Sequence, residues 1–153
     1  MKIVLIALIL VLSGCSSAQL SKQHISKPVY SDTMEIIRSA AEAAPDDVEG
    51  EYILYIKAIG SQGPFVYLNT ELDYRDQRAV SVAIHPSVLP QFEAKYGSQP
   101  QQFFLNKSIS VTGQAKRIRI SFNSQGKPTG KYYYQTHIRV MDISQIKVLS
   151  EHA

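Results

Sequence analysis

The feature that most limits the possible folds is a run of alternating apolar segments that a single helix interrupts. From about residue 49 onward, short segments rich in Ile, Val, Tyr and Thr are separated by Gly, Pro, Asn and Asp. Segments of this kind predict strands joined by turns. Three strands are predicted before the interruption, at residues 52–59, 65–69 and 79–84. The first is apolar on nearly both faces, which indicates a central strand.

The interruption is a helix predicted from about residue 87 to residue 96. Ser87 is expected to cap its N-terminus, and Gly97 is expected to end it. The helix has one apolar face, made of residues at positions i, i+3 and i+7: Leu89, Phe92 and Tyr96. A helix with a single apolar face must pack against the strands on either side of it in the sequence.

Two long strands follow the helix, over residues 108–122 and 132–142, with a brief strand at residues 146–148. In the first of them the apolar residues move from odd to even positions, which predicts a bulge near residues 115–117. A loop is predicted over residues 123–131. The residues expected to point into the core are Val80, Val82, Ile84, Ile109, Val111, Ile138 and Val140.

Three strands, one helix and two long strands are the element order of an OB-fold, a five-stranded Greek-key barrel. The expected fold class is therefore mainly β, with the helix between strands three and four closing the barrel. A shorter helix is predicted before the barrel, over residues 31–44, capped by Asp32 and packed loosely on the domain.

Residues 50–149 also resemble the OB-type domains of bacterial lipoproteins described as nucleic-acid-binding. The segments that carry the resemblance are Tyr67–Thr70, Asp73–Arg78, Lys107–Ala115 and Tyr133–His137. None of these segments is a catalytic motif. The resemblance implies a fold, and it implies an activity only weakly, because OB barrels serve many functions.

The N-terminus predicts export and lipidation. Lys2 precedes an unbroken apolar run over residues 3–12, which is too short to span a bilayer and is typical of a secretory signal. Leu12-Ser13-Gly14-Cys15 then resembles the lipobox of bacterial lipoproteins, which implies acyl chains on Cys15. An ordinary cleaved signal with a chance cysteine is the alternative. Ser16 is compatible with an outer-membrane anchor facing the periplasm, again by resemblance.

The predicted domain organisation follows from these segments. Residues 1–14 form the lipoprotein signal peptide, and residues 15–30 form the lipidated N-terminus and a polar tether. Residues 31–48 form the short helix and a linker, and residues 49–150 form the barrel. Removing Lys2 with the signal leaves 15 Lys and Arg against 13 Asp and Glu, so the whole chain carries no charge typical of a dedicated polyanion binder.

Catalytic and metal-binding signatures are absent from the sequence. The four histidines are scattered, and Cys15 is the only cysteine. Glu71, Asp73 and Asp76 form a small acidic group beside Arg75 and Arg78, which is typical of a solvated turn with ion pairs rather than of a metal site. We therefore expect no catalytic residues, no metal and no cofactor beyond the covalent lipid. An enzyme with a spatially assembled site remains a remote alternative.

A basic and aromatic group of residues is the candidate binding site. Its members are expected on the fourth and fifth long strands and the loop between them: Lys116, Arg117, Arg119, Lys127, Lys131, Tyr133, His137 and Arg139. Beyond the predicted bulge, Arg117 and Arg119 are expected to share one face with His137, Arg139 and Tyr133. Cationic grooves with aromatic platforms are typical of OB-folds that bind single-stranded nucleic acid.

Two functions follow from this group, in a preferred order. The first is a non-enzymatic, lipid-anchored envelope module that binds a protein, a glycan or a small ligand. The alternative is binding of single-stranded nucleic acid through the basic and aromatic face. The first ranks higher because the envelope holds little nucleic acid, and because long cationic side chains also cover exposed apolar surface.

Overall fold

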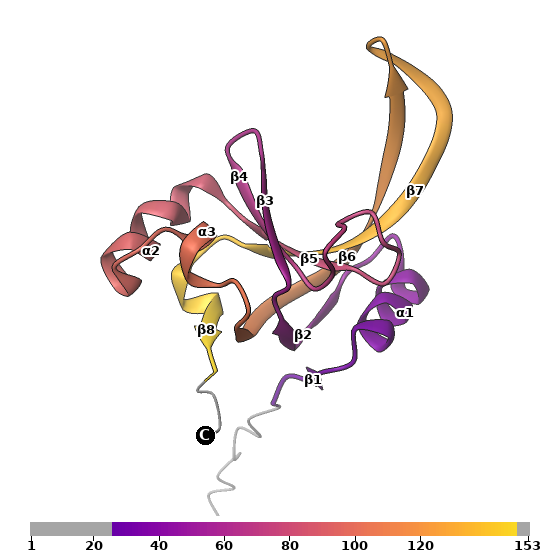
Figure 1. Ribbon diagram of the computed structural model, residues 1–153. Coiled ribbons are helices and arrows are strands. Elements are labelled where there is room, and N and C mark those ends of the chain that lie inside the picture. The colour runs from indigo at the N-terminus through magenta and orange to yellow at the C-terminus, as the bar shows by residue number, and fades with distance from the viewer. Residues whose placement is uncertain (1–25, 150–153) are drawn as a thin grey trace, which may run out of the picture.

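The alternating segments form one mixed β-sheet that curls into a partly open barrel, shown in Figure 1. The structure is a computed structural model that describes residues 26–149. Cys15, the signal segment and most of the predicted tether lie outside the described residues. Its elements, in chain order, are β1 (Val29–Tyr30), α1 (Thr33–Ala43), β2 (Val48–Tyr55), β3 (Ala58–Gln62), β4 (Phe65–Asn69), β5 (Val80–Ile84), the 3-10 helix η1 (Pro86–Val88), α2 (Leu89–Tyr96), α3 (Pro100–Phe103), β6 (Ser108–Ser124), β7 (Lys127–Val140), the 3-10 helix η2 (Ile143–Gln145) and β8 (Ile146–Val148).

The strand order is β1-β2-β6-β7-β5-β4-β3, with β8 also paired to β6. The two ends of the barrel sheet, β2 and β3, are consecutive in the chain and meet at Ile56 and Lys57. The Ile56 N–H donates to the Lys107 carbonyl (3.0 Å), and the Lys57 N–H donates to the Asn69 carbonyl (2.9 Å). The predicted first strand is therefore interrupted where it changes partner from β6 to β4.

This order agrees with the predicted OB-type barrel when β2 and β3 are counted as one bent strand. The predicted number of five strands is too low. The break at Ile56 divides the first strand, and β1 and β8 add short strands to β2 and β6. Among residues 26–149, no helix has the length and apolar character needed to cross a bilayer.

The barrel interior contains the residues that the strand pattern predicts. All seven predicted inward residues are fully buried: Val80, Val82, Ile84, Ile109, Val111, Ile138 and Val140. Phe92 is also fully buried, and its ring lies 5.3 Å from that of Phe104 in an edge-to-face arrangement. Leu89 and Tyr96 pack partly buried against the same core. The apolar face of α2 therefore contributes to the core as predicted.

Helix capping at this position differs from the prediction. Ser87 does not cap α2; instead the His85 imidazole accepts a hydrogen bond from the Ser87 N–H and caps η1. Val88 precedes α2 without a side-chain cap. The helical segment begins twice, first as η1 and then as α2, because Pro86 and Pro90 are each tolerated only in the first turn of a helix. Gly97 ends α2 in the left-handed conformation at φ 70°, as predicted.

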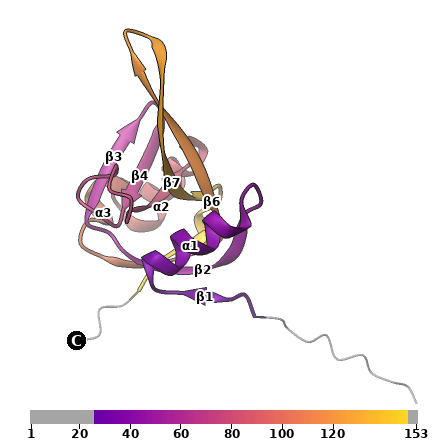
Figure 2. The same ribbon diagram turned by 90° about the vertical axis from the view of Figure 1, so that its right-hand side faces the viewer.

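Helix α1 is packed more tightly than predicted. The Asp32 carboxylate accepts a hydrogen bond from the Met34 N–H at 2.8 Å, so the predicted cap is present. Ile36 and Ala40, four residues apart on one stripe, are fully buried against the barrel. Figure 2 shows α1 crossing in front of the β6–β7 ribbon. The helix is thus part of the core, because a barrel with an open side needs cover there.

The predicted bulge near residues 115–117 is wrong. β6 pairs with β2 and then with β7 in continuous register through Ala115, and the register shifts only between Ser121 and Asn123. The apolar residues change parity because the surroundings of the strand change. Before Ala115 in the sequence, one face of β6 packs against the core. After Ala115, the β6–β7 ribbon extends out of the barrel. Alternation of the backbone is uninterrupted.

The β6–β7 connection is also shorter than the predicted loop. Gln125 (φ 51°) and Gly126 (φ 75°) form a two-residue turn, and β7 begins immediately at Lys127. Two consecutive left-handed residues are typical of the hairpin turns that match strand twist. In the barrel, β6 pairs with β2 as far as Ala115, and β7 pairs with β5 from Thr136 onward. We call residues 116–135, whose strand partners all belong to β6 and β7, the β-arm (Figure 1).

Candidate functional site

The predicted binding residues lie on the β-arm and its base, but on two opposite faces. Cross-strand partners share a face, and Arg117 pairs with Thr136, and Arg119 with Tyr134. Lys116 pairs with His137 on the other face. The prediction that Arg117 and Arg119 share a face with His137, Arg139 and Tyr133 is therefore wrong. It depended on the bulge, which would have turned the two arginines over.

The face towards α1 carries a ladder of arginine and tyrosine side chains, and we call it the α1 face. The Arg117 guanidinium lies 3.6 Å from the ring centroid of Tyr134, and that of Arg119 lies 4.0 Å from the centroid of Tyr132. Both tyrosines are substantially exposed, at 39% and 48%. A stacked guanidinium still directs its N–H groups outward in the plane of the group. The ladder therefore offers flat aromatic surface and hydrogen-bond donors together.

Most cations of the β-arm and its base lack a carboxylate partner. Eight Lys and Arg residues and no Asp or Glu occur between Glu93 and Asp142. Within residues 26–149, Lys116 pairs with Asp47 at 2.9 Å. No carboxylate of the described residues lies within 4.0 Å of the remaining cations: Arg117, Arg119, Lys127, Lys131 and Arg139. Positive charge is therefore concentrated on the arm although the whole chain is nearly balanced.

The opposite face of the arm is aromatic and apolar. The rings of Phe122 and Tyr133 lie 5.3 Å apart, and Ile120 pairs with Tyr133 across the strands. The Gln135 amide donates to the Tyr133 hydroxyl (2.8 Å) and to the Tyr74 carbonyl (3.2 Å). This network fixes Tyr133 beside the loop that joins β4 to β5. Tyr133 is therefore held in place, whereas its neighbours on the α1 face are more exposed.

His137 does not belong to the positive surface. Its Nε2 lies 2.7 Å from the side-chain amide oxygen (Oε1) of Gln135, and its ring packs against that of Tyr67 with the ring centroids 5.7 Å apart. Burial, with a smaller contribution from the nearby Arg139 charge, lowers the pKa of His137 to about 4. The imidazole is consequently neutral at physiological pH. It contributes packing and a hydrogen bond rather than charge.

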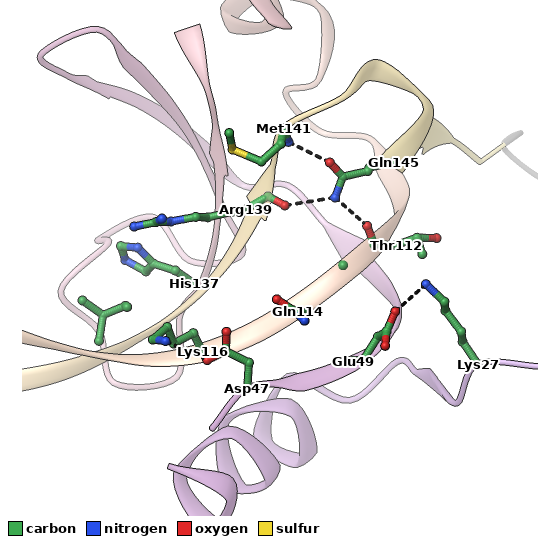
Figure 3. A pocket seen from close by; sticks show the side chains of 12 residues that line it. Lys27, Asp47, Glu49, Thr112, Gln114, Lys116, His137, Arg139, Met141 and Gln145 are labelled. Carbon is green, nitrogen blue, oxygen red and sulfur yellow. Dashed lines mark hydrogen bonds and ion pairs between the residues drawn. The ribbon is translucent and has the colours of Figure 1, made fainter. Parts of the chain in front are cut away.

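A hollow at the base of the arm holds three of the predicted residues, as Figure 3 shows. Lys116, His137 and Arg139 line this hollow of about 620 Å³ on the face away from α1. Its two carboxylates are paired, Asp47 with Lys116 and Glu49 with Lys27 at 2.7 Å. In each pair the lysine offsets the charge of the carboxylate. Arg139 is therefore the one cation of the described lining without a carboxylate partner.

The acidic turn between β4 and β5 contains the ion pairs that its sequence predicts. Arg75 pairs with Asp73 at 2.8 Å, and Arg78 pairs with Asp76 at 2.7 Å. The hydrogen bonds from Arg78 lower the pKa of Asp76 to about 2. Within the described part of the chain, no group of three His, Cys, Asp or Glu side chains is placed to hold a metal.

Sequence reasoning missed Tyr132 and Tyr134 as members of the site. Both have the same strand parity as Thr136, Ile138 and Val140, which lie in the core, so the alternation of β7 gives no sign that they are exposed. Two signals were available. One is the stretch without acidic residues after Glu93, and the other is the Arg-x-Arg of β6, which alternates in step with the Tyr-x-Tyr of β7.

Comparisons with known proteins leave the family open. No protein-family model matches the sequence, and no curated protein matches it. Among solved structures, an aspartyl-tRNA synthetase from Entamoeba histolytica is similar at TM-score 0.44 and 15% identity, covering 100% of this chain and 29% of that one. A Leishmania major protein described as an aspartyl-tRNA synthetase is similar at TM-score 0.41 and 11% identity, with 87% and 23% covered. The chain thus spans less than a third of either protein, and likenesses this weak carry no inference about ligand.

Proposed function

We propose that this protein is a binding module without chemistry of its own, and that its β-arm binds single-stranded nucleic acid. The observation that carries the proposal is the ladder on the α1 face, where Arg117 and Arg119 lie on the rings of Tyr134 and Tyr132. Such a ladder offers a stacking surface for bases and guanidinium groups for phosphates within one ribbon. Both are the interactions that sequence-tolerant single-strand binders use.

Charge supports a polyanionic ligand over a protein or glycan partner, which the sequence alone ranked first. A neutral glycan would use the tyrosines but would leave the cluster of cations without a role. An acidic protein would use the cations but has no need of regularly spaced flat rings. A single strand alternates bases and phosphates and uses both. The preferred order of the two functions is therefore reversed.

A titration of fluorescently labelled single-stranded DNA and RNA 12-mers tests this proposal. The soluble protein starting after Cys15 should bind at low salt, and each phosphate neutralised should contribute about −0.7 to the slope of log affinity against log salt. Arg119→Ala should weaken binding of all sequences and reduce that slope by about 0.7. Lys147→Ala is the matched control, because Lys147 pairs with Ser110 at the barrel end of β6.

Two results would overturn the proposal. One is the absence of saturable binding at low salt, and the other is equal weakening by Arg119→Ala and Lys147→Ala. Inorganic polyphosphate serves as a competitor, because it carries charge without bases. If polyphosphate displaces the strand at equal phosphate concentration, the ligand is any polyanion and stacking has no part.

We further propose that the module is anchored to the bacterial outer membrane through acyl chains on Cys15. The support is the apolar run of residues 3–12 followed by Leu-Ser-Gly-Cys. Two or more acyl chains give stable anchoring, because each buried methylene contributes about 0.8 kcal/mol. Incorporation of labelled palmitate should be lost in Cys15→Ser. Equal labelling of the variant and the parent would contradict the anchor.

A further inference from the structure

We infer that the pocket between α1 and the β-arm holds one nucleobase of the bound strand. This inference rests on the proposed function and assigns a specific place to one nucleotide. The pocket has a volume of about 290 Å³ and opens at the base of the arginine–tyrosine ladder. Its lining comes from three separate parts of the chain: Ile37 and Ala41 of α1, Gln77 of the β4–β5 loop, and Arg117, Tyr132, Tyr133, Tyr134 and Thr136 of the arm and its base.

The aromatic side of the pocket continues the ladder. Tyr132 and Tyr134 lie two residues apart on β7, and their rings are 5.6 Å apart at an interplanar angle of 76°. Rings at such an angle present one face and one edge to the same space, which suits a planar ligand stacked on one of them. A base in the pocket would stack on one of the two tyrosine rings and contact the edge of the other.

The apolar side of the pocket is provided by the second stripe of α1. Ile36 and Ala40 face the barrel core and are fully buried, whereas Ile37 and Ala41, the next residues along, are half-buried and line the pocket. The first stripe fixes the helix, so the second is held rigidly against the arm. Ala41 is small, and its methyl leaves the space that a larger side chain would fill.

Two polar groups of the pocket are available to the edge of a base. The exposed side-chain amide of Gln77 and the largely buried side chain of Thr136 both line the pocket. An amide offers both a donor and an acceptor, which matches the mixed pattern on the pairing edge of any base. Arg117 lies over Tyr134 in the same lining and can reach the phosphate of the nucleotide whose base is inside.

The size and polarity of the pocket favour one base over other planar ligands. The hollow on the other face of the arm is about twice as large and is lined by paired lysines and carboxylates with few rings. The smaller pocket contains no carboxylate and one arginine. A ligand that enters it must therefore be flat, small and attached to an anion, which describes a nucleotide within a strand.

The test compares two 12-mers, homothymidine and an abasic strand with the same backbone, on variants that change only the pocket. Ala41→Leu fills the pocket and keeps a good helix former in α1. Its affinity for homothymidine should fall about tenfold, while its affinity for the abasic strand should stay unchanged. Ala43→Leu, two residues on in the same helix and outside the lining, is the matched control for helix packing.

Gln77→Met is the second variant, because it removes the amide with little change in size. It should reduce differences in affinity among the homopolymers of the four bases and leave the thermal midpoint unchanged. If Ala41→Leu binds homothymidine as tightly as the wild type does, the pocket inference is wrong and the proposed function stays intact. If Ala41→Leu loses as much affinity for the abasic strand as for homothymidine, the pocket inference is also wrong, because lost phosphate contacts would then explain the weaker binding. Failure of the wild type to bind either strand would refute the proposed function itself.

Discussion

The barrel half and the arm half of the β6–β7 ribbon share one backbone pattern but have opposite surroundings. On a single face, β7 presents Thr136, Ile138 and Val140 to the core and then, towards the tip, Tyr134 and Tyr132 to solvent. On β6 the same face changes from Val111 and Ala115 to Arg117 and Arg119. Side-chain alternation is continuous across the boundary at Ala115.

The difference teaches that a strand's function can change along its length without a change in its conformation. Where β2 and β5 flank the ribbon, apolar burial decides which residues are tolerated. Beyond those strands the ribbon has two free edges, and an isolated two-stranded ribbon gains little stability from its own contacts. The residues of the arm are therefore free to serve binding, with stability provided by the barrel half.

Removing the arm gives the largest expected effect. Replacing residues 119–134 by Asn-Gly joins Ile118 to Gln135, which are already cross-strand partners. The barrel should fold with a thermal midpoint within about 5 °C of the parent, because little core is lost. Single-strand binding in the fluorescence titration should be abolished. If the shortened protein still binds the strand, the interface lies on the barrel. If it does not fold, the arm is part of the cooperative folding unit.

Matched isoleucines in the two halves of the ribbon give the next largest effect. Ile138 is fully buried, and Ile138→Ala should lower the free energy of unfolding by about 2–5 kcal/mol. Ile120 is half-buried on the arm, and Ile120→Ala should cost less than about 1 kcal/mol. Urea denaturation measures both. Similar losses in the two variants would contradict the division of the ribbon into a stabilising half and a binding half.

The smallest expected effect concerns pH at the boundary between the halves. Burial lowers the pKa of His137 to about 4, below the value of about 6.5 in the unfolded chain. Between these values the unfolded state binds more protons, so stability is complete above about pH 6.5 and falls as the pH approaches 4. The loss should be roughly 1–3 kcal/mol. Urea denaturation of His137→Gln should show a shallower decline over this range, and an identical decline would contradict the burial of the ring.

The sequence alone predicts most of the strands and the two longer helices in their observed order. Period-two patterns predicted β4, β5, the barrel halves of β6 and β7, and the brief β8, while Gly97 and Asp32 marked helix ends at their observed positions. All seven predicted inward residues are buried. These features are local, because alternation, caps and turn residues act within a few positions of one another.

Which neighbours each strand face contacts follows from the three-dimensional arrangement of the elements. The shift of apolar residues in β6 was predicted as a bulge, yet it marks the point where β2 stops pairing with the strand. The arginine–tyrosine ladder likewise depends on the pairing of β6 with β7, whose register is continuous from Ala115 to Ser121. The pocket depends on α1, whose residues lie roughly 75 to 100 positions before the β6 and β7 residues they face. Such contacts follow from how the barrel closes, and a local pattern carries no information about a partner that far along the chain.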